Sequence, residues 1–242
     1  MPNNYFQFQQ FLIEQGACAM KVSTDACLLG AAADLSGATR LLDIGTGTGL
    51  LALMAAQRHP TVGIEAVEID AAAAAQAAAN AAASPWAGRI RVHGLSLADY
   101  AAARPPAFSH LICNPPFFRQ SLRSPDAART TARHEAADTL TFAALATFAA
   151  TFLQPQGLLT VLLPPAEMQA LESVAAPLGL QPATRLVVRH RPGSKPLRHI
   201  TGFRRGTAGV LAEQELTIRT AHSETEYSPE FRALLAGFYL AL

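Results

Sequence analysis

Four consecutive residues, Asn114-Pro115-Pro116-Phe117, form the pattern with the most definite chemistry in this sequence. They follow an apolar run that ends at Cys113, so they lie at the end of a predicted strand. An amino group conjugated to a base is a poor nucleophile because its lone pair is delocalised into the ring. The Asn114 side-chain carbonyl and the Pro115 backbone carbonyl could accept its two N–H bonds, while the consecutive prolines fix the chain. Phe117 offers a flat face on which an extruded base can stack.

A second pattern, Asp43-Ile44-Gly45-Thr46-Gly47-Thr48-Gly49, joins a predicted strand to a predicted helix. Glycines allow a ligand to approach the backbone closely, and the helix N-terminus supplies unpaired N–H groups. Glu68, followed by Ile69, ends the next predicted strand, where a carboxylate can accept hydrogen bonds from both hydroxyls of a ribose. The loop spacing differs from the G-x-G-x-x-G of dinucleotide sites and resembles the first motif of class I S-adenosylmethionine-dependent methyltransferases. An adenosine-containing cofactor is therefore predicted here.

Both patterns need alternating strands and helices to bring them to one edge of a sheet. Apolar runs predict strands at 41–44, 63–69, 90–93, 108–113 and 157–163, and helical patterns fall at 50–58, 71–83, 139–152, 166–178 and 229–240. This alternation predicts a parallel sheet, whose ligands bind beyond the carboxyl ends of the strands. Strands predicted at 184–190, 197–204 and 215–220 lack helices between them. We therefore expect an α/β, Rossmann-like, doubly wound, seven-stranded, mostly parallel sheet with antiparallel C-terminal strands, in one domain over residues 1–242.

Bulk properties do not select a function. Half of the 242 residues are hydrophobic, enough for a substantial core, and the formal net charge is +1, so a nucleic-acid partner would need a local basic surface. The three cysteines form no metal-binding cluster, which predicts no metal site and no disulfide framework. We expect a cytoplasmic protein with no obligate protein partner, since the sequence has no secretion signal and no run long enough to span a membrane.

With these motifs placed, nearly the whole chain resembles the tRNA1(Val) adenine-37 N6-methyltransferase family of the class I superfamily. The resemblance rests on segments from the N-terminus to the C-terminus: Phe8-Gln9-Gln10-Phe11, Cys18 to Asp25, Asp43-Ile44-Gly45, Leu50 to Met54, Ala66-Val67-Glu68, Ser84-Pro85-Trp86, Asn114 to Phe118 and Phe238-Tyr239-Leu240. It implies S-adenosylmethionine as cofactor and an adenine N6 of tRNA as methyl acceptor.

The resemblance also implies residue roles. A segment over residues 1–36 would cover the cofactor, and Asn114 to Phe117 would hold and stack the adenine. The residues implied to line the cofactor are Lys21, Thr24, Asp25, Asp43, Gly45, Thr46, Gly47, Glu68, Ile69, Ser96 and Asn114. Ser96, with Asp99 three residues on, stands where relatives often carry an aspartate that meets the cofactor adenine. Phe117 stands where many amino-methylating relatives have tyrosine; stacking is kept but a hydroxyl hydrogen bond is lost.

Two basic stretches are candidates for RNA contact. Between Thr184 and Ala212 there is no acidic residue, and the basic residues include Arg189, Arg191, Lys195 and Arg198 around a predicted turn at Pro192-Gly193-Ser194. A second group, Arg119, Arg129 and Arg133, follows the Asn-Pro-Pro-Phe pattern, where substrate contacts are common. His134 beside them is interpreted as structural, because amine methylation scarcely needs a general base.

Chemistry alone leaves the acceptor open. Adenine, guanine and the glutamine side chain all present a planar conjugated NH2, so rRNA guanine-N2 and release-factor glutamine methyltransferases are alternatives. The N-terminal signature, which belongs to the resembled family, disfavours both alternatives, and the basic stretch favours a nucleic-acid acceptor over a protein. A nicotinamide-dependent dehydrogenase would need a different glycine spacing and a proton-relay pair, and a non-catalytic binding module would have little reason to keep Asn114.

Overall fold

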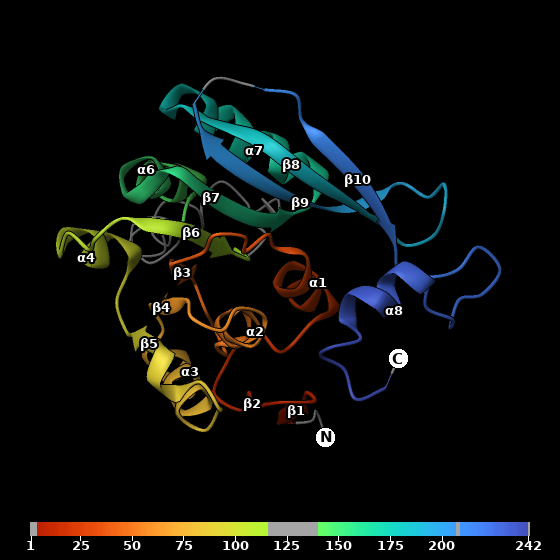
Figure 1. The fold of residues 1–242 in the computed structure, drawn as a ribbon, viewed down its shortest axis with the longest axis horizontal. Helices are drawn as coiled ribbons and strands as arrows, with labels where there is room; N and C mark the ends of the chain where they lie inside the picture. Colours follow the sequence, from red (N-terminus) through yellow and green to blue (C-terminus); the bar gives the residue numbers. More distant parts are fainter. Residues whose placement is uncertain (1–3, 116–139, 207–208, 242) are drawn as a thin grey trace, which may run out of the picture.

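The computed structural model describes residues 4–115, 140–206 and 209–241, and its centre is one eight-stranded sheet. The strand order is β10-β8-β9-β7-β6-β3-β4-β5, as Figure 1 shows. The strands are β3 Arg40–Ile44, β4 Gly63–Val67, β5 Ile90–His93, β6 Phe108–Cys113, β7 Leu153–Leu163, β8 Leu180–Arg189, β9 Pro196–Arg205 and β10 Ala212–Thr217. The expected α/β fold with a mostly parallel sheet is confirmed.

The C-terminal part of the sheet differs in detail from the expectation. In the described part of the chain, β9 alone runs against the other strands of this sheet: it pairs antiparallel with β7 and β8, whereas β10 pairs parallel with β8. The reason is that β9 returns the chain to the amino edge, so the next strand starts there and runs in the direction of β8. All eight predicted strand segments, β10 included, join this sheet, which therefore has one strand more than the seven-stranded sheet expected.

Helices cover both faces of the sheet. One core packs α1 Thr24–Ala32 and α2 Leu50–Arg58 with α8 Pro229–Leu235, and the other lies under α4 Leu97–Ala102, α6 Phe142–Phe152 and α7 Pro165–Ala175 (Figure 1). α3 Ala71–Ala82 lies beside α2. Short 3-10 turns at Ala87–Arg89 and Ala176–Leu178 complete the elements. β6 is buried along its whole length, as expected of a central strand covered on both faces.

Segments near the two ends of the chain pair with each other, in a small antiparallel arrangement that was not predicted from the sequence. β1 Tyr5–Gln7 and β2 Leu12–Glu14 form an antiparallel hairpin, and Phe8 bridges to Tyr239. The predicted C-terminal helix to residue 240 is too long, because α8 ends at Leu235. Gly237, a poor helix former, follows, and its carbonyl accepts a hydrogen bond from the Gln57 side chain at 2.6 Å.

Candidate active site at the carboxyl edge of the sheet

The ends of four neighbouring strands bring the predicted motifs together. Ile44 of β3 pairs with Cys113 of β6 and with Val67 of β4, which in turn pairs with His93 of β5. The residues that follow these positions, including the glycine loop, Glu68 and Asn114, therefore share one edge of the sheet. Segments more than sixty positions apart in the sequence meet here, as expected from the predicted parallel sheet.

The glycine loop is held by the neighbouring strand and leaves space beside its first two glycines. Gly45 and Thr46 donate backbone hydrogen bonds to the Val67 carbonyl at 2.9 and 3.1 Å. Gly45 and Gly47 have positive φ, and no described residue has an atom within 4 Å of the position that a Cβ would take on either glycine. Gly49 also has positive φ, but its Cβ would lie 3.4 Å from that of Ala77 on α3. The first two glycines thus face open space, and the third lets two helices approach each other.

Asp43, near the end of β3, is a buried acid, and one of its two carboxylate oxygens has no hydrogen-bond partner among the described residues. Its Oδ2 accepts hydrogen bonds from the Thr46 hydroxyl at 2.5 Å and from the Ala52 backbone at 3.1 Å. Its Oδ1 is buried and has no hydrogen-bond partner among the described residues. Burial raises the pKa of this carboxyl to about 7, against those two hydrogen bonds. A cationic donor such as an ammonium group would satisfy Oδ1 and hold the acid in its charged form.

Glu68 follows β4 and braces the glycine loop. Its carboxylate accepts the Gly47 backbone N–H on Oε2 at 2.8 Å and the Asp70 backbone N–H on Oε1 at 3.0 Å. Each carboxylate oxygen can accept a second hydrogen bond. Glu68 is half-buried, so a ligand beside the loop can reach it. The residue therefore combines a structural bond with capacity for two hydroxyl donors.

Apolar and polar side chains continue this edge beyond β4 and β5. Ile69 and Leu95 each stand two residues past the paired positions Val67 and His93, and their side chains are 46% and 42% exposed. Exposed apolar groups on adjacent strand ends can flank a flat ring, and Leu95 was not among the predicted residues. Ser96 caps α4, with its hydroxyl bonded to the Asp99 carboxylate at 2.7 Å.

The N-terminal segment lies against this edge. The carboxylates of Glu68 and Asp70 lie close enough to Cys18 to add to the rise in its thiol pKa, which is caused first by burial and is opposed by Lys21. Lys21 donates to the backbone carbonyls of Gln15 and Cys18, the latter at 2.9 Å, so it holds the turn before α1 together.

Two further predicted residues open α1. Ser23 is the N-cap of this helix and Thr24 its first residue, exposed to solvent. Asp25 forms an ion pair with Arg198 of β9 at 2.7 Å. The structure therefore joins a predicted cofactor residue to a predicted RNA-binding residue.

Asn80 is a site-shaping residue that the sequence reading did not single out. Buried on α3, it donates from Nδ2 to the carbonyls of Glu14 and Thr48, both at 2.8 Å, and accepts from the Glu14 backbone at 3.0 Å. It thereby ties β2 to the glycine loop. Asparagine is unfavourable inside helices, so an asparagine within an alanine-rich helix indicates a specific structural role for its side chain.

Asn114 begins the segment after β6. Its side-chain Oδ1 is buried and has no hydrogen-bond partner among the residues that the structure describes, and Pro115 beside it is buried. A buried carbonyl oxygen without a donor costs free energy, about 1–3 kcal/mol, unless a ligand supplies one. Five other predicted site residues lie outside the described residues: Pro116, Phe117, Arg119, Arg129 and Arg133. His134, interpreted as structural, lies outside them as well.

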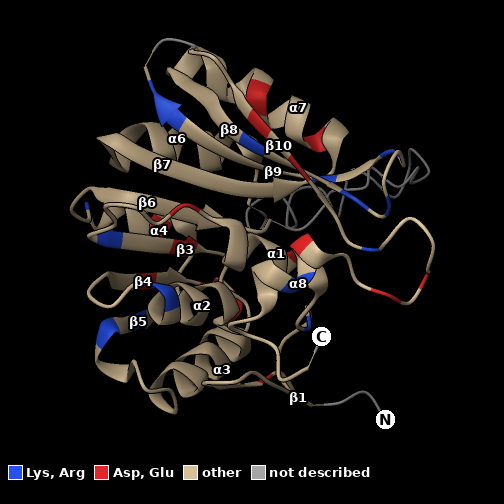
Figure 2. Cartoon of the chain, turned by 45° about the vertical axis from the view of Figure 1, so that its right-hand side comes forward, with Lys and Arg blue, Asp and Glu red and all other residues tan. Residues whose placement is uncertain are grey.

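The C-terminal basic residues surround the turn between β8 and β9, at the same edge, and acidic residues lie close by in the loop before α8 (Figure 2). Arg189 pairs with Glu215 of β10 at 2.8 Å, and Arg191 pairs with Glu224 of that loop. Lys195 is exposed. Part of the predicted charge is thus neutralised within the protein.

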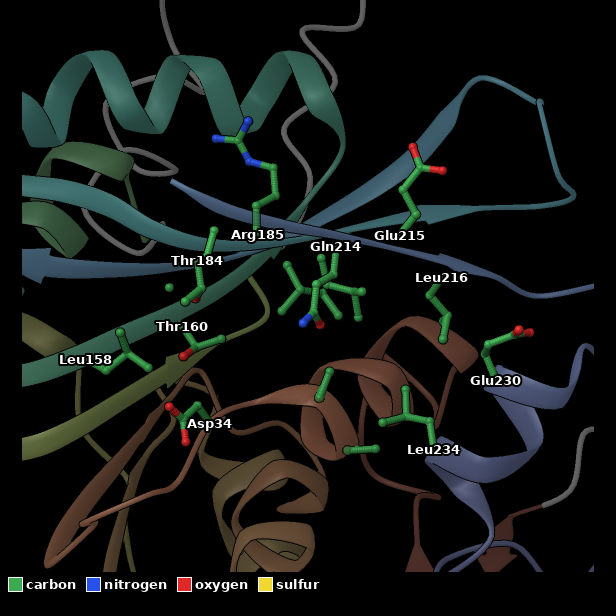
Figure 3. Close-up of a pocket in the computed structure, with 16 residues that line it drawn as sticks. Asp34, Leu158, Thr160, Thr184, Arg185, Gln214, Glu215, Leu216, Glu230 and Leu234 are labelled. Atoms are coloured by element: carbon green, nitrogen blue, oxygen red, sulfur yellow. The ribbon is translucent and has the colours of Figure 1, made fainter. Parts of the chain in front are cut away.

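A separate cavity of about 500 Å3 lies between the face of strands β7 to β10 and the helices α1 and α8 (Figure 3). Asp34, Thr160, Thr184 and Gln214 are among its polar lining residues. Of the predicted cofactor and catalytic residues that the structure describes, none lines it. Within the described ranges we find no cluster of metal-binding side chains and no helix able to cross a membrane.

Comparisons with known proteins agree with this geometry. Residues 20–164 match the family model "Methyltransferase small domain". The chain is similar, at 42% identity over 100% of both chains, to a tRNA1(Val) (adenine(37)-N6)-methyltransferase of Bacteroides thetaiotaomicron. A protein of that name from Serratia proteamaculans is 42% identical over 97% of this chain and 89% of its own length.

Solved structures show the same fold at lower sequence identity. A predicted O-methyltransferase from Agrobacterium tumefaciens superposes with a TM-score of 0.65 at 21% identity, covering 88% of this chain and 96% of its own. A ribosomal protein L11 methylase from Lactobacillus delbrueckii has a TM-score of 0.56 at 16% identity, over 81% of this chain and 84% of its own.

Proposed function

Because this chain belongs to the tRNA1(Val) (adenine(37)-N6)-methyltransferase family, we propose that it methylates the N6 amino group of adenine 37 in that tRNA, with S-adenosylmethionine as donor. The protein is a methyltransferase by family and by fold. The names of the relatives favour adenine over the guanine and glutamine acceptors that the chemistry alone left open.

One observation carries the proposal: the buried Asn114 Oδ1, which lacks a donor among the described residues, at the end of β6. An adenine amino group offers two N–H donors. If Asn114 Oδ1 and the Pro115 carbonyl accept them, the nitrogen lone pair is released from the ring and points away from both acceptors. The same hydrogen bonds stabilise the positive charge that grows on nitrogen during transfer. The proton can leave to water afterwards, so this proposal needs no general base.

The residues of the glycine loop fit the proposed cofactor. Asp43 Oδ1 would accept a hydrogen bond from the methionine ammonium, beside the open space at Gly45 and Gly47. When bound, S-adenosylmethionine supplies an electrophilic methyl group on a sulfonium. The free lone pairs of Glu68 would accept the ribose hydroxyls. These roles leave Thr46 to orient the Asp43 carboxylate through its hydroxyl.

The remaining predicted cofactor residues have supporting roles in this proposal. Ile69, with Leu95, would flank the adenine ring of the cofactor, and Ser96 would face it from the start of α4. Lys21 would act by holding the turn over residues 15–18 above the cofactor rather than by touching it. Thr24 and Asp25 open the helix that follows this turn. Positioning of the two substrates against each other then supplies much of the rate.

A labelling experiment tests the function. The purified protein is incubated with radiolabelled S-adenosylmethionine and an unmodified tRNA1(Val) transcript, or with the same transcript carrying guanine in place of adenine 37. After digestion to nucleosides, we expect label in N6-methyladenosine from the first transcript and none from the second. Label in a guanosine derivative, or none in either transcript, would overturn the proposal.

A further inference from the structure

Arg189, the last residue of β8, and Arg191, in the turn after it, differ in how their guanidinium groups are hydrogen-bonded. Arg189 donates from Nε and Nη2 to Glu215 at 3.1 and 2.8 Å, and from Nη1 to the Ser194 carbonyl. Arg191 pairs with Glu224 through Nη2, while its buried Nε has no hydrogen-bond partner among the described residues. All three guanidinium nitrogens of Arg189 therefore donate within the protein, whereas Nε of Arg191 has no acceptor in the described part of the chain.

The turn that carries Arg191 is closed by hydrogen bonds and lies at the same edge of the sheet as the candidate active site. Ser194 donates its backbone N–H to the Arg191 carbonyl at 3.1 Å, and Gly193 has the positive φ that such a turn needs. Because β8 runs parallel to β7, this turn projects from the carboxyl edge of the sheet, the edge that also carries Asn114. Lys195 is exposed on the same turn. A long anionic substrate bound at Asn114 could therefore extend across it.

The partner of Arg191 comes from the loop over residues 220–226, which joins β10 to α8. Glu224 binds Arg191 with one oxygen and lies 3.2 Å from His190 with the other. The loop is fixed at its base, where the Arg219 backbone donates to the His190 carbonyl at 2.9 Å. Glu224 itself is 70% exposed, and exposed ion pairs contribute little to stability. Another anion can replace it at small cost.

We propose that Glu224 occupies the place that a backbone phosphate of the tRNA takes on Arg191, so that the 220–226 loop competes with the substrate in the free protein. A phosphate can accept from Nε and Nη2 of one guanidinium together, which would satisfy the donor that Glu224 leaves unpaired. The inference rests on the proposed tRNA substrate and adds a residue that sets its affinity. It gives a role to the contact between Arg191 and Glu224, which comes from a separate loop.

Binding measurements on charge-neutralised variants test the inference. The dissociation constant of unmodified tRNA1(Val) transcript is measured by fluorescence anisotropy for the full chain, Glu224→Gln, Glu226→Gln and Arg191→Gln, and for Glu224→Gln combined with Arg191→Gln. Glu224→Gln should bind about three- to fivefold tighter than wild type. Glu226 lies in the same loop and contacts Thr220, so Glu226→Gln removes an equal charge and should stay within about twofold.

The Arg191→Gln background separates displacement from general charge repulsion. There the gain from Glu224→Gln should vanish, and the slope of log K against log salt should fall by about 0.7 to 0.9, as for one lost phosphate contact. Equal gains from both glutamate variants, or a gain that persists without Arg191, would overturn the inference. Tight wild-type binding with normal adenine methylation but no gain in Glu224→Gln would sink this inference alone. A wild type that neither binds nor methylates tRNA would also refute the proposed function.

Discussion

The carboxyl edge of the sheet has two halves that treat charge in opposite ways. In the β3–β4–β6 half, Asp43 and Asn114 each keep a buried acceptor without a partner among the described residues. In the β8–β9–β10 half, Arg189 and Arg198 carry ion pairs to acids of other elements. The first half thus leaves bonding capacity for small ligands, whereas the second uses much of its charge to hold elements together. A count of charges along the sequence cannot make this distinction, because the sequence does not show which charged residues pair with each other in the fold.

The largest effect on this comparison should come from the glycine loop. Gly47→Val places a side chain into the open space beside the loop, and we expect cofactor binding to become undetectable by calorimetry. Gly37→Val is the matched control, since Gly37 also has positive φ and open space but precedes β3, at the opposite edge. Both variants should lose about 1–2 kcal/mol of unfolding free energy from backbone strain. Equal loss of cofactor affinity in both would contradict a ligand site at the loop.

The buried acid should give the next largest effect. A cation binds the ionised form of Asp43, so affinity for S-adenosylmethionine should rise about tenfold from pH 6 to pH 8, through the raised pKa of about 7. Asp43→Asn should weaken binding by about tenfold or more at pH 8 and remove most of this pH dependence.

Stability of the cofactor-free protein should change with pH in the opposite sense. The folded-state pKa of Asp43 lies above its unfolded value, so this group's contribution to stability is greatest in acid and falls as pH rises toward 7. Thermal unfolding of wild type and Asp43→Asn across this range measures that contribution.

For the binding prediction, a wild-type affinity for S-adenosylmethionine that does not change with pH would show that Asp43 does not bind a cation.

A smaller effect should follow from the ion pair that links the N-terminal segment to the β8–β9–β10 half. Asp25 and Arg198 join α1 to β9, and both side chains are about one-quarter exposed. Asp25→Arg and Arg198→Asp should each weaken cofactor binding about two- to fivefold by loosening the N-terminal segment, and the double exchange should recover most of it. Calorimetric titration measures all four proteins. Failure of the exchanged pair to recover affinity would mean that each residue acts alone.

The smallest effect distinguishes the two arginines of the basic half. Arg189→Gln should lower the unfolding free energy by about 1 kcal/mol, because three donors lose acceptors within the protein, yet change tRNA affinity less than about twofold. Arg191→Gln should do the reverse, with stability nearly unchanged and tRNA affinity reduced about threefold. Chemical denaturation and anisotropy together separate these outcomes. If both variants lowered tRNA affinity equally, the basic residues of the β8–β9–β10 half would act together as a diffuse positive surface, without a distinct role for Arg191.

Much of the fold could be predicted because local signals agreed with the topology. The span of β6 and that of α2 follow directly from an apolar run and from a helix that starts at a glycine loop. The β1–β2 hairpin was not predicted; the turn after β1 pairs with Tyr239, over two hundred positions away, a contact that no local pattern records. The direction of β10 depends on where β9 returns the chain, which no local pattern records.

The candidate site shows the same division. The motifs predicted that Asp43, Glu68 and Asn114 would share an edge, since parallel strand ends must do so. Side-chain hydrogen bonds and ion pairs between different elements could not be predicted from the sequence. Asn80 binding both β2 and the glycine loop is one example, and Glu224 binding Arg191 is another.

The central claim is that the Asn114 carbonyl holds the acceptor amine, and single-turnover methylation of tRNA at saturating cofactor tests it most directly. Asn114→Ala removes the acceptor, whereas Asn114→Asp keeps an oxygen at that place. We predict that the alanine variant transfers methyl at least about a hundredfold more slowly than wild type, with cofactor affinity within about twofold. The aspartate variant should be at least about tenfold faster than the alanine variant. An alanine variant within about threefold of wild type would contradict the account.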